Sequence, residues 1–172
     1  LKRLDGNKYK FFVCALREKP DDLHSEIAKY AEVTILGVKN KFNPSVIFQL
    51  RKLIKIIQPD IIHTHLFQAR FYTTLAYLFS RRTILITHKH NNVNPKKHNI
   101  FIFLEMSSIL VNKKVIAISQ SVKKSLMKFE LVPSKKIFVL PNGVDYQKFY
   151  ESAISKQYTN DEPMITGTVC RL

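Results

Sequence analysis

Four of the six histidines lie at the ends of two apolar, strand-like segments, "PDIIHTH" and "RTILITHKH". They are His63 and His65 in the first segment, and His88 and His90 in the second. Because side chains alternate between the two faces of a strand, the histidines of each pair share a face. If the strands are neighbours, the four rings converge at one rim of a sheet. An imidazole at such a rim can hydrogen-bond a substrate hydroxyl or accept its proton.

Two other interpretations of these histidines stay open. Imidazole is a common zinc ligand, so the four rings could hold a metal. We expect no metal site, because no cysteine or carboxylate accompanies the histidines and pairs two residues apart on a strand are a weak metal signal. The third interpretation is that His63 and His88 simply hydrogen-bond backbone groups of loops.

A second candidate site lies where Ser119, Gln120 and Ser121 begin a predicted helix, directly after the strand-like "VIAIS". Free N–H groups at such a position can bind an anion. Plain N-capping by Ser119 explains the same residues equally well. The sequence contains no GxGxxG, GxxxxGK[ST] or GxSxG motif.

The elements that position these residues alternate regularly along the chain. Strands are predicted over residues 9–16, 32–38, 59–65, 82–90, 113–119 and 135–143, and helices over 21–31, 43–60, 66–80, 100–112 and 119–129. This alternation with short connections predicts an α/β fold with a doubly wound, mostly parallel sheet. Functional loops of such sheets follow the carboxyl ends of the strands, where the histidines fall.

The sharp stop at Pro141, Asn142 and Gly143 predicts a domain boundary. We expect a first domain over residues 1–149 and a polar linker over 150–163. Residues 164–172, in the strand-like "PMITGTVCRL", would then begin a second domain.

The net charge of +15 favours anionic partners, although a composition biased toward Lys, Asn, Ile and Phe would produce the same charge.

The first residues lack the apolar core of a signal peptide. Cys14 and Cys170 form no disulfide framework, and we expect buried free thiols in a reducing cytosol.

Several stretches together resemble glycosyltransferase family 4, of the GT-B fold. They are "PDIIHTHL", "ILITHKHNN", "KKVIAISQSVKKSL", "VPSKKIFVLPNGVDYQKF" and "ITGTVCRL", in the order usual for the family. The resemblance implies retaining transfer of a sugar from a nucleotide-diphospho-sugar to a glycan or lipid-linked acceptor, in the synthesis of cell-envelope polysaccharide. It implies no cofactor besides this donor substrate.

The resemblance also assigns candidate site residues. His90, followed by Asn91, matches the family's histidine at the acceptor side of the cleft. His65 and Ser119 are candidates for the same side because each lies at the end of a predicted strand. Gly167 and Arg171 would contact the donor diphosphate, whose growing negative charge a guanidinium stabilises. The interdomain loop would include Asn142, Gly143 and Asp145.

The family's first strand and its glycine-containing loop would precede Leu1, and further donor-binding residues would follow Leu172. We therefore expect a fragment that is inactive alone and marginally stable.

The resemblance places the protein in the cytoplasm, with peripheral binding to anionic lipid at the inner face of the membrane. The amphipathic helix over residues 44–57 fits such binding, but ordinary packing on the sheet is the favoured explanation. The alternative function is a non-catalytic basic module for anionic lipid or nucleic acid, although we expect no nucleic-acid partner. It would require one basic face formed by Lys52, Lys55, Lys123, Lys124 and Lys128.

Overall fold

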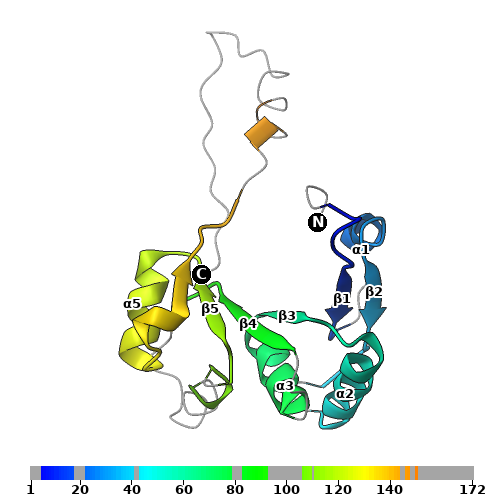
Figure 1. Cartoon of the computed structure of the whole chain (residues 1–172), viewed down its shortest axis with the longest axis horizontal. Helices are drawn as coiled ribbons and strands as arrows, with labels where there is room; N and C mark the ends of the chain where they lie inside the picture. Colours follow the sequence, from blue (N-terminus) through cyan, green and yellow to red (C-terminus); the bar gives the residue numbers. More distant parts are fainter. Residues whose placement is uncertain are drawn as a thin grey trace, which may run out of the picture. The chain divides into compact units, whose positions relative to one another are not determined.

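A computed structural model describes residues 5–17, 22–40, 43–78, 83–92, 106–109, 111–143, 146–147 and 150 (Figure 1). The chain divides into two compact units, Leu1–Pro141 and Asn142–Leu172. All the elements named below belong to the first unit. The strand predicted over residues 163–172 lies outside the described residues.

The described elements confirm the α/β alternation. In chain order they are β1 (Phe12–Ala15), α1 (Asp22–Ile27), β2 (Glu32–Ile35), α2 (Ser45–Ile57), β3 (Ile61–His65), α3 (Phe67–Tyr77), β4 (Ile84–Lys89), β5 (Lys114–Ala117), α5 (Gln120–Phe129), the 3-10 helix η1 (Ser134–Lys136) and β6 (Ile137–Val139). Of the helix predicted over 100–112, the structure describes a helical segment at 106–109.

All described strand pairs are parallel, as predicted, but the strands form two sheets. β1 pairs with β2, and β3, β4, β5 and β6 pair in that order. The single sheet that the alternation predicts is therefore divided into two sheets in the part of the chain that the structure describes.

Helix α2 packs through the apolar face that its spacing predicts. Val46 and Leu50 are buried in a cluster with Tyr72 and Ala76 of α3, and Figure 1 shows the two helices side by side. The hydroxyl of Tyr72 also accepts a 2.7 Å hydrogen bond from the backbone N–H of Asn43. These contacts support the packing explanation of the amphipathic pattern.

A second apolar cluster joins α5 to the four-stranded sheet. Val122 and Leu126 of α5 are buried against residues of β5 and β6, and Figure 1 shows α5 beside these strands. The strand residues of this cluster are Val115, Ala117 and Ile137.

The two faces of the four-stranded sheet differ in burial. One face contributes Thr64, Leu85 and Thr87, which are 4%, 1% and 1% exposed. On the opposite face, Ile61 and Phe138 are 56% and 55% exposed. The histidines of β3 alternate with Thr64, so they belong to this opposite, open face.

The prediction of a buried thiol is wrong for Cys14. Cys14 is a free thiol, as predicted, but it occupies one of the exposed positions of β1, whose residues alternate between exposed and half-buried. Cys170 lies outside the described residues.

Within the described ranges, no helix is both long enough and apolar enough to span a membrane.

Candidate functional site

The structure brings the four histidines together, as their spacing predicts. β3 and β4 are parallel neighbours, and the register aligns His65 with His88. The ring centroids of His63 and His65 are 4.4 Å apart, and those of His88 and His90 are 4.5 Å apart. We call these four residues the histidine cluster.

The closest polar contact in the cluster joins the ends of the two strands. Nδ1 of His65 lies 3.0 Å from Nε2 of His90, so one ring donates a hydrogen bond to the other. His65 is the last residue of β3, and His90 directly follows β4. Two of the predicted acceptor-side residues therefore contact each other at the carboxyl end of the sheet.

The surroundings of His63, His65 and His88 lower the pKa of each ring. Partial burial, and then the charge of neighbouring histidines, lowers the pKa of His63 and His65 below 6.5. The same causes lower the pKa of His88 to about 4. A neutral imidazole keeps one ring nitrogen with a free lone pair, which can accept a proton or bind a metal.

The rings of His63 and His88 contact each other across the neighbouring strands β3 and β4. The ring of His63 stacks on that of His88, with centroids 5.6 Å apart and planes 8° from parallel. Nε2 of His88 is buried and has no hydrogen-bond partner within the described ranges. At this atom the structure does not support the prediction that His88 satisfies a backbone group.

The backbone at Leu66 is strained where β3 leads into α3. Leu66 has φ 66° and ψ 163°, a combination that residues other than glycine rarely adopt. Its side chain is 67% exposed, so side-chain burial does not explain the conformation. Such strain is common next to functional sites, and here it follows His65 directly.

A buried ion pair fixes the end of β4. Nζ of Lys89 lies 2.5 Å from Oε1 of Glu130, with side chains that are 12% and 0% exposed. Glu130 is the C-cap of α5, so the pair ties that helix to the strand segment between His88 and His90. The sequence did not predict this ion pair. The feature that could have indicated it is Glu130, a single carboxylate directly after the helix predicted over residues 119–129.

Ser119 acts as a helix cap. Its Oγ accepts a 3.2 Å hydrogen bond from the backbone N–H of Val122, which confirms the capping interpretation. Asn91 is exposed directly after His90.

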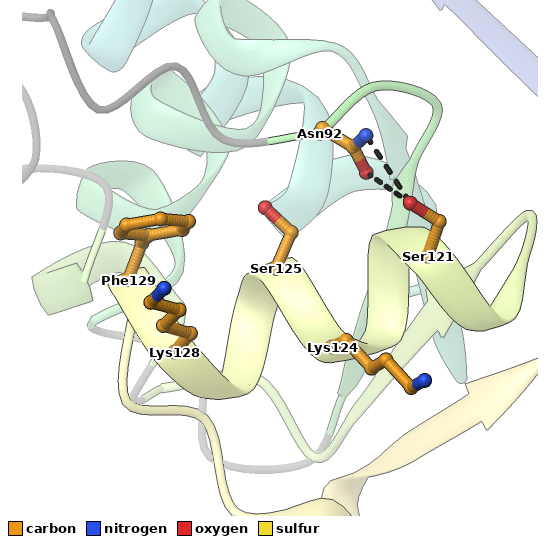
Figure 2. Close-up of a pocket in the computed structure, with 6 residues that line it drawn as sticks. All are labelled: Asn92, Ser121, Lys124, Ser125, Lys128 and Phe129. Atoms are coloured by element: carbon orange, nitrogen blue, oxygen red, sulfur yellow. Dashed lines mark hydrogen bonds between the residues drawn. The ribbon is translucent and has the colours of Figure 1, made fainter.

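A surface pocket of about 320 Å³ lies beside α5. Asn92 and Ser121 contact each other at one end of it, with Nδ2 of Asn92 3.3 Å from Oγ of Ser121, and Figure 2 shows Lys128 and Phe129 at the other end. Two lysines and two serines are among the residues that line it, so the pocket suits an anionic or hydroxyl-bearing group. The sequence reasoning did not single out Asn92.

The other predicted site residues belong to the second unit or lie outside the described residues. Asn142 and Gly143 are exposed in the second unit. Gly167, Arg171 and Asp145 lie outside the described residues.

The sequence of this chain matches a known protein family. A sequence profile described as Glycosyltransferase Family 4 matches residues 1–148. The chain belongs to glycosyltransferase family 4. No curated protein matches this family 4 chain.

Solved structures share the fold of this family 4 chain. A glycosyltransferase from Rickettsia africae ESF-5 has a TM-score of 0.62 at 22% identity, over 87% of this chain and 41% of that one. Anabaena Alr3699/HepE, in complex with UDP, has a TM-score of 0.60 at 15% identity, over 80% and 45% of the two chains. A UDP-N-acetylglucosamine 2-epimerase has a TM-score of 0.52 at 17% identity, over 76% and 48%. The chain spans less than half the length of each of these proteins.

Proposed function

We propose that this chain is the acceptor-side part of a retaining glycosyltransferase. The enzyme transfers a sugar from a nucleotide-diphospho-sugar to a hydroxyl of a glycan or lipid-linked acceptor, in the synthesis of cell-envelope polysaccharide. The observation that carries this proposal is the 3.0 Å contact between His65 and His90 at the carboxyl end of the parallel sheet, in a chain of family 4.

The chemistry of the transfer requires a group that handles a proton. A bond forms between the acceptor oxygen and the anomeric carbon, the bond from that carbon to the diphosphate oxygen breaks, and the hydroxyl proton must leave. An imidazole at the acceptor hydroxyl can hydrogen-bond it and take up this proton. His90 is the candidate for this contact, and its bond to His65 orients its ring.

The donor is proposed to bind outside the described residues. The Anabaena HepE protein was solved with UDP, and in a second structure with UDP and glucose, which supports a nucleotide sugar as donor here. Gly167 and Arg171 are the candidates for the diphosphate, because a fixed guanidinium stabilises the charge on the leaving group.

The proposed setting is the cytoplasmic face of a membrane, where a lipid-linked acceptor is accessible. The net charge of +15 supports attraction to anionic lipid. The lysines of the postulated basic face belong to two helices, Lys52 and Lys55 to α2 and the others to α5. Since α2 and α5 pack in different apolar clusters, the charge also suits plain solvation.

The test is a transfer assay with the natural protein that carries this sequence. Radiolabelled UDP-, GDP- and ADP-sugars are supplied in turn, with a lipid extract of the host membrane as acceptor and a reaction without acceptor as control. We expect label in a glycolipid or glycan from one donor, with the anomeric configuration of the donor retained in the product by NMR. Failure of every donor, together with steeply salt-dependent binding to anionic vesicles or nucleic acid, would overturn the proposal in favour of a binding module.

A further inference from the structure

Three members of the histidine cluster have the arrangement of metal ligands. His63, His65 and His88 each contribute one ring nitrogen, and the three nitrogens lie within 4.8 Å of one another. We propose that these three residues form a binding site for a zinc ion. The site goes beyond the proposed sugar transfer, and no step of that transfer passes through the metal.

The strands hold the three ligands on rigid backbone. His63 and His65 are two residues apart on β3, so they share a face, and the register places His88 of β4 directly beside His65. A tetrahedral zinc ion bound at about 2.0–2.1 Å from each nitrogen separates the nitrogens by about 3.4 Å. All three rings lie on the open face of the sheet.

The unpaired nitrogen of His88 is an independent sign of a ligand. Nε2 of His88 is buried without a hydrogen-bond partner within the described ranges. A buried polar atom that loses its water without gaining a partner costs about 1–3 kcal/mol. A metal ion bound through this nitrogen would give it a partner.

His90 completes the arrangement from outside the three ligands. An imidazole has two ring nitrogens, so His65 can bind the metal through one and keep its contact with His90 through the other. Metal-bound histidines usually hydrogen-bond through their second nitrogen, and such a bond fixes the ring. The fourth position of a tetrahedral ion then remains open to water.

The ligand set selects the kind of ion. Three imidazoles suit zinc, copper and nickel, whereas magnesium and calcium require oxygen ligands. Metal binding requires neutral imidazole rings, so the zinc affinity of such a site falls as the pH is lowered.

The experiment measures zinc in protein purified without chelator and without a polyhistidine tag. Elemental analysis after dialysis against micromolar zinc is expected to give one equivalent per chain. His63→Gln and His88→Gln are expected to lower the zinc affinity at least ~100-fold in titration calorimetry, since loss of a partner of a ligand already costs about 10–100-fold. His24→Gln, on α1, is the matched control and is expected to retain the full affinity.

Cobalt keeps the test decisive if a variant fails to fold. Cobalt added to the unmodified protein is expected to give the intense visible absorption of a four-coordinate site, and zinc is expected to displace it. Substoichiometric zinc, an affinity that His63→Gln and His88→Gln leave unchanged, or the weak spectrum of six-coordinate aqueous cobalt would each overturn the proposal. None of these outcomes depends on sugar transfer, so the zinc site and the glycosyltransferase function fail or stand separately.

Discussion

His65 and His88 lie directly opposite each other on neighbouring parallel strands, with ring centroids 5.3 Å apart. On the other face of the same strands, Oγ1 of Thr64 lies 3.1 Å from Oγ1 of Thr87, next to each histidine in the chain. The threonine pair is buried and links β3 to β4 on the covered face of the sheet, whereas the histidines lie on the open face. The strands are therefore fixed independently of the histidine rings, which leaves those rings available for ligands.

The histidine cluster predicts how stability depends on pH. The folded-state pKa of His63, His65 and His88 lies below the ordinary value of 6.5, so the unfolded chain binds protons first as the pH falls. The stability contributed by these neutral rings is complete above about pH 6.5 and is lost as the pH falls toward 4, where the pKa of His88 lies. Urea unfolding of metal-free protein between pH 4 and 7.5 measures this slope.

Comparison of two variants isolates the contribution of the cluster to that slope. His88→Gln is expected to flatten the loss of stability between pH 6.5 and 4, because one group with a lowered pKa is removed. His24→Gln, on α1 and outside the cluster, is the control for removing a histidine elsewhere in the chain. Equal slopes for His88→Gln and the unmodified chain would contradict the lowered pKa of His88.

The buried ion pair between Lys89 and Glu130 predicts a large cost for Glu130→Gln. The change leaves the ammonium of Lys89 buried beside a neutral amide, and breaking such a pair costs about 3–5 kcal/mol. Glu32→Gln is the matched control, since its pair with Lys10 is exposed, with side-chain exposures of 63% and 72%, and contributes about 0–1 kcal/mol. Equal free energies of unfolding for the two variants would show that the buried pair is unimportant.

The conformation of Leu66 predicts that Leu66→Gly stabilises the fold. Glycine adopts positive φ without the steric cost of about 1–3 kcal/mol that other residues carry, and the Leu66 side chain is largely exposed. After the greater flexibility of glycine in the unfolded chain is subtracted, a net gain of about 1 kcal/mol remains. Leu78→Gly, at a position that is 57% exposed and has φ −49°, should instead destabilise. If thermal unfolding gives the two variants the same change in melting temperature, backbone strain at Leu66 is contradicted.

The capping bond of Ser119 predicts a moderate loss of stability for Ser119→Ala. Loss of the bond to the Val122 N–H costs about 1 kcal/mol of unfolding free energy. Ser121→Ala removes a hydroxyl whose contact with Asn92 is exposed, and its effect should stay within about 0.5 kcal/mol. A larger loss for Ser121→Ala in chemical denaturation would argue against the cap.

Periodicity identified the described helices and strands because burial follows it closely. Val46 and Leu50 of α2 are buried as the spacing predicts, and the ranges of helix and strand are mostly shorter than predicted. The division of the sheet was not predictable from the sequence, because hydrogen bonding between strands depends on tertiary placement. The exposure of Cys14 has the same origin, since apolar patterning does not reveal which face of β1 is covered.

The site was predictable in part. Alternation within a strand and the parallel order of β3 and β4 were enough to bring the four histidines together. The register that aligns His65 with His88 was not predictable from the sequence, because it depends on how the two strands pair in the folded sheet. The Lys89–Glu130 pair joins residues 41 positions apart, a separation at which charge pattern carries no information.

The most direct test of the account is the rate of sugar transfer by the natural protein with His90→Ala, compared with His24→Ala. Both variants are assayed metal-free and zinc-loaded, so that an effect on the proposed zinc site is separated from an effect on transfer. The account predicts a loss of at least ~100-fold for His90→Ala in both states, the range expected for a group that handles the proton, and no loss for the control. Transfer by His90→Ala at the rate of the control would contradict the assignment of this site to the acceptor.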